Sequence, residues 1–162
     1  MEMSYLMLGG NIGDRMDYLL QCVDLLRRGV GNIVAMSAIY ECEPWGFEDS
    51  QWFLNQVVVA ETNLDPFHLL EKVQRIEQIL GRQRTHKGYH SRTMDIDILL
   101  YGNHIIDTSE LVIPHPRMAE RMFALQPMSE IASDLEHPVL LHTMGYLREH
   151  CADRKQVRAY IL

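Results

Sequence analysis

The chain of 162 residues lacks several features that would place it in a common class of proteins. Its 15 lysine and arginine residues are outnumbered by 22 aspartate and glutamate residues, which gives a net charge of −7. Nucleic-acid-binding surfaces need a basic face, so we expect no nucleic-acid partner. No apolar run approaches the ~20 residues of a membrane helix, and the amino terminus lacks the basic region and apolar core of a signal peptide. We therefore expect no membrane partner.

Cysteine is scarce as well. Cys22, Cys42 and Cys151 are odd in number and far apart, so they offer neither a disulfide framework nor the CxxC spacing of zinc and redox sites. Three reduced thiols predict a cytoplasmic protein. A chain of this length can bury about two-thirds of its unfolded surface in one core, so we expect a single domain over residues 1–162. We also expect a monomer.

The glycine-rich motifs that commonly bind nucleotides are absent. No GxxxxGK[ST] segment follows the first predicted strand, the GxGxxG template finds no match, and neither HExxH nor GxSxG occurs. If this protein binds a nucleotide, side chains and a metal must hold the phosphates in place of a backbone cradle.

What is present is a basic loop followed by an acidic strand, RQRTHKGYHSRTMDIDILLYG at 82–102. Residues at i and i+2 of a strand share a face, so Asp95 and Asp97 should lie side by side while Ile96 and Ile98 face the other way. Magnesium is typically bound by a few carboxylates together with substrate phosphates and water. The pattern therefore predicts a metal site for a polyphosphate, and an ordinary solvated sheet face is the alternative.

Three arginines of the loop, Arg82, Arg84 and Arg92, place positive charge beside these carboxylates. A guanidinium can bind phosphate through two parallel hydrogen bonds, and a loop that contains Gly88 can close over a ligand. An exposed loop with scattered charge is the alternative interpretation.

Hydrophobic periodicity predicts secondary structure in the order strand, helix, strand, strand, helix, strand. We expect strands at 3–8, 33–40, 52–61 and 93–101 and helices that begin after Asp14 and at Asp65-Pro66. After them we expect a short hairpin strand at 105–106, a helix at 143–150 and an edge strand at 157–161. This order is typical of an α+β, ferredoxin-like βαββαβ sandwich, with an antiparallel sheet covered on one side by two helices packed on it.

Two groups of side chains could bind a nucleotide or a flat heterocycle. Phe53 and Asn55 share one face of the valine-rich strand at 52–61, and an aromatic ring next to an amide suits a pterin or a purine. Ordinary core packing is the alternative for Phe53. Gln74 and Glu77 lie one helical turn apart, which could also be a plain polar face.

The segment RxRxxxxxxxRTMDIDILLYG resembles the signature of the 6-hydroxymethyl-7,8-dihydropterin pyrophosphokinase family, whose members act in folate biosynthesis. LGGNIGDR at 8–15 is similar to the family's amino-terminal block. YECEPWG at 40–46 and FLNQVV at 53–58 resemble its pterin-binding segments, and IPHPRMAERMFALQP at 113–127 resembles its late block. The resemblance spans nearly the whole chain in the expected order.

The resemblance implies transfer of pyrophosphate from ATP to the hydroxymethyl group of a reduced pterin, with release of AMP. It also implies two Mg ions as cofactors, held by Asp95 and Asp97, and it assigns assistance in the transfer to Arg82 and Arg92. It assigns ATP binding to Gln74, Glu77, Arg84, Ile98, His115 and Arg121. It assigns pterin binding to Cys42, Pro44, Trp45, Phe53, Asn55 and Phe123.

The chain departs from the family pattern at several positions. Tyr89-His90-Ser91 replaces a usual Trp-Gly-Pro, Cys42 stands where threonine is common, and Glu110 stands where some members have an arginine. Two other functions remain open. A nucleotidyltransferase also uses a DxD strand but attacks the α-phosphorus, and its usual glycine-serine helix start is not found before Asp95. A binding module without catalysis is the second, because this fold hosts many functions.

Overall fold

A computed structural model of the protein describes residues 1–81 and 93–161. Its central feature is a six-stranded sheet whose described pairings are all antiparallel. The strand order is β5-β1-β4-β3-β8, and β2 also pairs with β4. The strands are β1 (Glu2–Gly10), β2 (Gly31–Met36), β3 (Tyr40–Cys42), β4 (Phe53–Thr62), β5 (Asp95–Tyr101) and β8 (Val157–Ala159).

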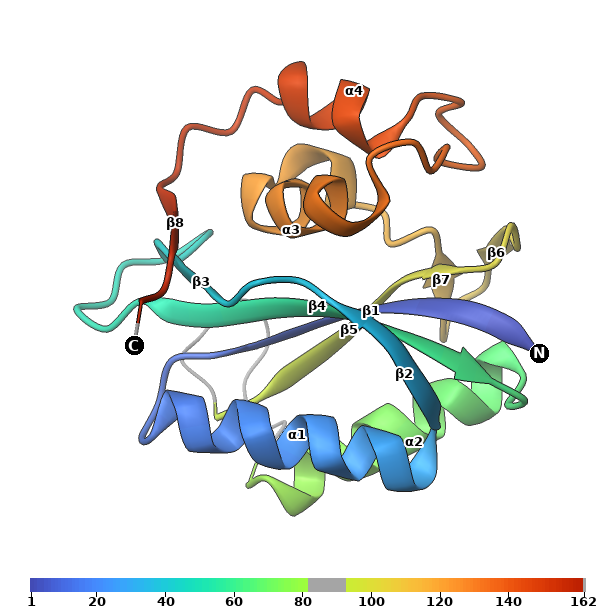
Figure 1. The fold of residues 1–162 in the computed structure, drawn as a ribbon, viewed down its shortest axis with the longest axis horizontal. Helices are drawn as coiled ribbons and strands as arrows, with labels where there is room; N and C mark the ends of the chain where they lie inside the picture. Colours follow the sequence, from blue (N-terminus) through green and yellow to red (C-terminus); the bar gives the residue numbers. More distant parts are fainter. Residues whose placement is uncertain (82–92, 162) are drawn as a thin grey trace.

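Helices cover both faces of this sheet (Figure 1). On one face lie α1 (Arg15–Gly29) and α2 (Pro66–Ile79), and on the other α3 (Met122–Ala132) and α4 (Met144–Glu149). The order from β1 to β5 confirms the ferredoxin-like α+β prediction. The expectation that helices cover only one side was wrong, because α3 was not predicted. Pro127 lies inside α3, and a proline within a helix obscures its sequence pattern.

Side-chain caps start the helices where the sequence predicted. The Asp14 carboxylate accepts a hydrogen bond from the Asp17 N–H at 3.1 Å. Asp65 accepts from the N–H groups of Phe67 and His68 at 3.0 Å each, and α4 begins after Thr143 in the same way. These caps satisfy N–H groups that have no partner within the first helical turn.

The strand predicted at 33–40 is divided into β2 and β3 in the structure. Ser37 lies at the interruption, where its hydroxyl accepts from the Val57 N–H at 3.0 Å and its carbonyl from the Gln56 side chain at 2.9 Å. Side-chain bonds replace part of the ladder there, so periodicity alone could not locate the break.

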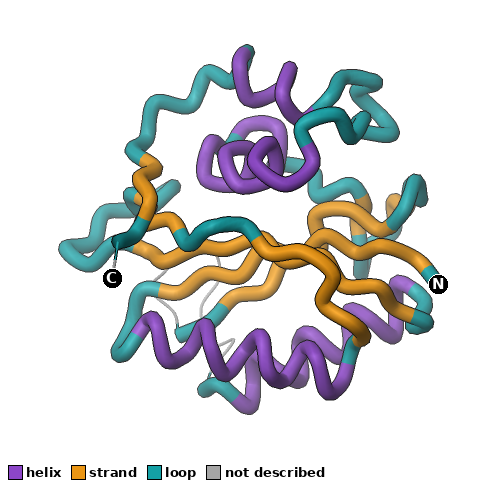
Figure 2. Tube along the Cα trace, in the orientation of Figure 1, coloured by secondary structure: helices purple, strands orange, loops and turns teal. Residues whose placement is uncertain are grey.

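The prediction of a short hairpin strand at 105–106 was wrong. Ile106 does not pair with the preceding strand but belongs to β6 (Ile106–Asp107), which pairs with β7 (Val112–Ile113) as a separate small sheet. Figure 2 shows that the chain from β5 to α3 consists mostly of loop, and η1 (Met118–Glu120) adds one short helical turn. The His115 N–H donates to the Leu99 carbonyl at 2.9 Å, which attaches this loop to β5.

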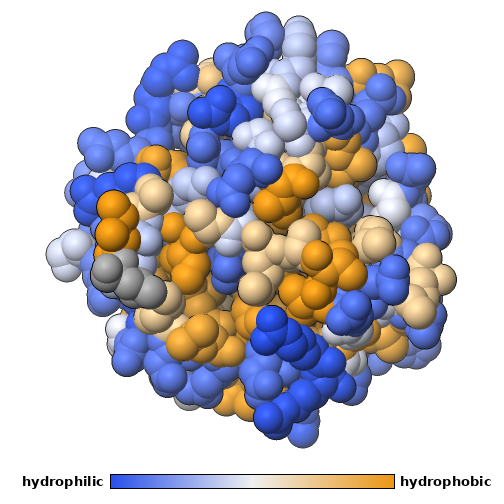
Figure 3. Space-filling view, viewed as in Figure 1, coloured by the Kyte–Doolittle hydropathy of each residue, from blue (hydrophilic) through white to orange (hydrophobic). Residues whose placement is uncertain are grey.

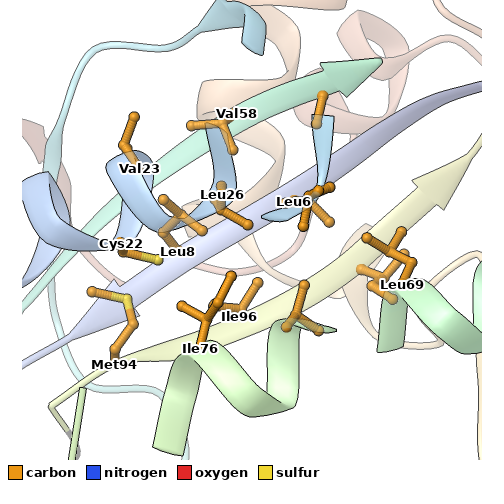
Figure 4. Close-up of a cluster of buried hydrophobic side chains, with 14 of the residues drawn as sticks. Leu6, Leu8, Cys22, Val23, Leu26, Val58, Leu69, Ile76, Met94 and Ile96 are labelled. Atoms are coloured by element: carbon orange, nitrogen blue, oxygen red, sulfur yellow. The ribbon is translucent and has the colours of Figure 1, made fainter. Parts of the chain in front are cut away.

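The main core lies between the sheet and the helix pair α1 and α2. In Figure 4, side chains of α1 and α2 point toward Leu6 and Leu8 of β1 and Ile96 of β5. Leu6 and Leu8 are fully buried, and each such side chain contributes roughly 1.5–3 kcal/mol of hydrophobic stabilisation. A smaller core under α3 includes Met7 and Leu125. The sheet is therefore held rigidly between two apolar layers.

The chain end returns to the sheet as β8, which pairs with β3. Arg158 of β8 and Arg15 of α1 both donate to the Glu41 carboxylate, at 2.6 and 2.8 Å. The hydrogen bond from Arg158, followed by that from Arg15, lowers the pKa of Glu41 despite its partial burial. This charged group joins three elements at one sheet edge.

Apolar and polar residues alternate over the surface shown in Figure 3, with the orange residues mainly across its middle. The exposed apolar residues include Val34 and Met36 of β2. Within residues 1–81 and 93–161, no helix is both long and apolar enough to cross a membrane.

Candidate active site

A cleft of about 520 Å³ opens on the sheet face that carries α3 and extends around β5 to α2. Its floor is formed by Met7 and Gly9 of β1, Asn55 of β4 and Asp95 of β5. Its walls come from the loop after β3, from α2 and from the segment between β6 and α3. Cleft residues that are far apart in the chain therefore meet because the sheet aligns β1, β4 and β5.

The two strand carboxylates lie at one end of this cleft. Asp95 and Asp97 are half-buried and line the cleft, while Ile96 between them is packed in the main core. In the register of the sheet, Asp95 lies opposite Gly9 and Asp97 opposite Met7. The predicted alternation along β5 is confirmed.

The donor set at this end of the cleft fits magnesium. Among the described residues, no group of three or more His, Cys, Asp or Glu side chains could enclose a metal ion. Two adjacent carboxylates that open into a cleft leave the other coordination positions to phosphate and water oxygens, which is the arrangement that magnesium prefers. Asp95 and Asp97 are the residues that would hold the ions.

Three residues expected to bind the nucleotide lie near β5 in different ways. Gln74 of α2 lines the cleft. Ile98 also lines it, although only 5% of the residue is exposed. Glu77 is buried, and its carboxylate accepts a hydrogen bond from the Ile96 N–H at 2.9 Å. Glu77 thus contacts the backbone between the two aspartates.

The other end of the cleft is aromatic. Phe53, Phe123 and Trp45, three of the residues expected to bind a pterin, line it together with Phe47. The Phe47 ring meets Phe53 edge to face, with centroids 5.9 Å apart and an interplanar angle of 84°. Aromatic rings and the Asn55 amide in one cleft can accommodate a flat heterocycle with hydrogen-bonding edges.

Arg121 joins the aromatic end to the charged end. Its guanidinium carbon lies 4.7 Å from the centre of the Trp45 ring and 5.5 Å from that of Phe123. The residue is only 7% exposed and immediately precedes α3. Stacking of a planar guanidinium on aromatic rings fixes its direction, so Arg121 presents an oriented positive charge to the cleft.

His115 lines the cleft as a neutral ring. Burial lowers the pKa of its imidazole to about 4, with a further decrease from Arg121 and an opposing effect of Asp95. The Arg117 backbone N–H donates to His115 Nδ1 at 3.2 Å, which places the proton of the neutral ring on Nε2. His115 can therefore donate one hydrogen bond to an anionic ligand.

Cys42 and Pro44 are buried at the aromatic end but do not line the cleft themselves. Burial raises the pKa of the Cys42 thiol to about 12, which leaves it uncharged, and the neighbouring Asn55 side chain opposes the increase. Asn55 is only 5% exposed, yet it lines the cleft. Cys42 thus lies next to Asn55, which lines the cleft, without lining the cleft itself.

Several candidates lie outside the described residues: Arg82, Arg84 and Arg92. The cleft also contains residues that sequence reasoning did not assign to it, among them Gly9, Phe47 and Arg117. Arg117 lies 5.8 Å from the centre of the Trp45 ring and is two positions after His115, so its place in the late block was a usable signal. For Gly9 and Phe47 no local pattern indicated a position in the cleft.

The chain is similar to known proteins over most of its length. Residues 5–133 match the family described as 7,8-dihydro-6-hydroxymethylpterin-pyrophosphokinase (HPPK). A 2-amino-4-hydroxy-6-hydroxymethyldihydropteridine pyrophosphokinase of Bacillus subtilis is 47% identical over 136 residues, which cover 83% of this chain and 81% of that protein. The protein of the same name from Aquifex aeolicus is 41% identical over 135 residues and 83% of each chain.

Solved structures show the same fold. The chain is similar to a Plasmodium falciparum HPPK-DHPS structure with pteroate, with a TM-score of 0.75 and 16% identity over 91% of this chain. It spans only 44% of that longer chain. At this identity the similarity concerns the fold alone.

Proposed function

The chain belongs to the 7,8-dihydro-6-hydroxymethylpterin-pyrophosphokinase family, and from that premise we propose how its cleft performs the reaction. The function is transfer of pyrophosphate from ATP to the hydroxymethyl group of 6-hydroxymethyl-7,8-dihydropterin in folate biosynthesis. The observation that carries the proposal is that one cleft contains an aromatic and amide end and a carboxylate end. The pterin occupies the first and the polyphosphate the second.

At the pterin end, the rings of Phe53 and Phe123 contact the faces of the heterocycle and the Asn55 amide bonds its edge. The loop that carries Pro44 and Trp45 closes this end. Because these groups come from β4, α3 and the loop after β3, the heterocycle is held from several sides and its hydroxymethyl arm is directed toward β5.

At the phosphate end, Asp95 and Asp97 would hold two magnesium ions. When bound, the ions would neutralise the polyphosphate and acidify the attacking hydroxyl group. Arg121 and the Nε2 proton of His115 bind phosphate oxygens, and Gln74, Glu77 and Ile98 lie on the nucleotide side. Arg84 is proposed to bind ATP, and Arg82 and Arg92 to assist the transfer, although all three lie outside the described residues.

The reaction forms one bond and breaks one. The pterin hydroxymethyl oxygen attacks the β-phosphorus of ATP, the bond from the β-phosphorus to the α,β-bridging oxygen breaks, and AMP leaves with that oxygen. The hydroxyl proton passes to solvent. Positioning by the cleft and its positive charges supplies most of the acceleration in such transfers.

Product analysis tests this function. Purified protein with ATP, magnesium and the reduced pterin should form AMP and the pterin pyrophosphate in equal amounts. Release of free pyrophosphate with a nucleotidylated pterin would instead identify a nucleotidyltransferase. Binding of both ligands without turnover would identify a binding module.

We also propose that residues 1–162 form one domain that acts as a monomer in the cytoplasm. One chain supplies every described element of the cleft, and Cys22, Cys42 and Cys151 are free thiols, as is usual in reducing compartments. Light scattering should give a mass near the 18.8 kDa of one chain, and a mass of twice that value would contradict the monomer.

A further inference from the structure

Three residues form a row across the floor of the cleft. Gly9 of β1 lies opposite Asn55 of β4 on one side and opposite Asp95 of β5 on the other. Directly opposed residues of a sheet point to the same face, with Cβ atoms about 4.5–5.5 Å apart. The row therefore joins the amide proposed to contact the pterin to a carboxylate proposed to hold metal, through a residue without a side chain.

Gly9 is needed there for space and not for its backbone conformation. Its φ lies outside the left-handed region, unlike that of Gly13 at +69°. A Cβ atom at Gly9 would lie 2.1 Å from Asn55 Oδ1 and 3.3 Å from Asn55 Cγ. Real Cβ atoms do not approach oxygen so closely, so an alanine at this position would force the Asn55 amide to turn or move.

Cys42 is a second neighbour of the same amide. The Asn55 side chain lies next to Cys42, which is 1% exposed, and interacts with its thiol. Cys42 lies opposite Phe53, two positions from Asn55 on the same face, so it is a diagonal neighbour of Asn55. The amide thus lies against the Gly9 backbone and next to Cys42.

This placement matters because an asparagine amide is not symmetric. One end accepts hydrogen bonds and the other donates them, so a half-turn exchanges the groups offered to a ligand. If the Asn55 amide were turned, the heterocycle would meet a hydrogen-bond acceptor where it needs a donor. Loss of one buried hydrogen bond weakens binding by about tenfold.

On the basis of the proposed function, we propose that Gly9 and Cys42 are positioning residues that set the orientation of the Asn55 amide and so determine recognition of the reduced pterin. Neither residue needs to contact ATP for this role. Substitution of either should therefore affect the pterin and leave the nucleotide largely unaffected.

The first test is Gly9→Ala. We expect the KM for the pterin to rise about tenfold, while the KM for ATP stays within about twofold. Gly29→Ala is the matched control, because a Cβ atom there would meet only the Lys72 side chain, at 3.8 Å. That control should leave both KM values unchanged.

A double-mutant cycle shows whether Gly9 acts through Asn55. With Asn55→Ala the obstructed amide is gone, so adding Gly9→Ala should change the pterin KM by less than about twofold. If Gly9→Ala raised the pterin KM equally in the wild type and in Asn55→Ala, Gly9 would not act through Asn55. A folded Gly9→Ala protein with an unchanged pterin KM would overturn the role of Gly9.

Cys42 provides a test that leaves the strand backbone alone. Cys42→Ala should raise the pterin KM about threefold to tenfold, and Cys42→Ser, which keeps a hydrogen-bonding group, should restore it most of the way. If the melting curve shows that Gly9→Ala does not fold, the two Cys42 variants test the positioning role by themselves. Equal pterin KM values for the wild type, Cys42→Ala and Cys42→Ser would contradict the proposal.

The wild-type protein separates this inference from the proposed function. If it does not release AMP from ATP and the pterin, the proposed function fails. If it does so and the variants keep the wild-type pterin KM, only the positioning role fails.

Discussion

The Glu77 carboxylate accepts a 2.9 Å hydrogen bond from the backbone N–H of Ile96, the residue between Asp95 and Asp97. Among the strands in residues 1–81 and 93–161, β5 lies at the edge of the main sheet, so no described strand pairs with this N–H on that side. A buried side chain of α2 thus completes the hydrogen bonding of the strand that carries both carboxylates.

Glu77→Ala should therefore destabilise the fold by about 1–3 kcal/mol and weaken magnesium-dependent activity, because it leaves the Ile96 N–H buried without this acceptor. Glu77→Gln keeps an acceptor oxygen and should lose less stability and activity than Glu77→Ala. Glu71→Ala, on the exposed side of the same helix, is the control. Chemical denaturation measures the first effect, and equal stability of the alanine variants at 71 and 77 would contradict it.

Asp97→Asn should lower kcat at least about a hundredfold with little change in the melting temperature, because the substitution removes a charge proposed to hold metal but keeps the shape of the side chain. Asp107→Asn, an exposed position on β6, should retain full activity. EDTA should abolish turnover of the wild type, and added magnesium should restore it. Undiminished activity of Asp97→Asn would exclude Asp97 from the reaction.

Acid should weaken the turn that follows α3, because His137 holds it as a neutral ring. Its Nδ1 accepts from the N–H groups of Val139 and Leu140, at 3.2 and 3.0 Å. Burial lowers the pKa of His137, so the unfolded chain binds the proton more tightly than the folded one. Stability from this residue is complete above the ordinary histidine pKa of about 6.5 and decreases as the pH falls below it.

The measurement is the free energy of unfolding between about pH 7.5 and about pH 5, roughly one unit above and one and a half units below the ordinary histidine pKa. His137→Asn, whose oxygen can replace Nδ1 as acceptor, should flatten the decrease, while the exposed control His142→Ala should retain the wild-type slope. Identical slopes for all three proteins would show that His137 does not contribute.

Asp153 should support the cleft from outside it. Its carboxylate accepts from the Met122 N–H at 2.9 Å, at the start of α3 between Arg121 and Phe123. Asp153→Ala should cost about 1 kcal/mol of stability, as expected for loss of a helix cap, and should raise the KM of both substrates. Asp134→Ala, exposed beyond the other end of α3, is the control. A change in neither stability nor KM would rule out this support.

Local patterns predicted much of the fold. The caps at Asp14 and Asp65, the alternation along β5 and the order from β1 to β5 all follow from spacing over a few residues. The predictions failed where distant parts of the chain decide the outcome. Ile106 pairs with Ile113 and not with the preceding strand, and α3 forms despite Pro127 because its apolar side packs on the second face of the sheet.

The sequence by itself determined which chemical groups the protein possesses and that Asp95 and Asp97 share a face, because a strand repeats every two residues. Only the tertiary structure decided what those groups meet. Gly9 lies against Asn55, and Arg121 lies between Trp45 and Phe123. Such contacts depend on strand register and on the packing of α3, which involve residues far apart in the chain and leave no mark in local periodicity.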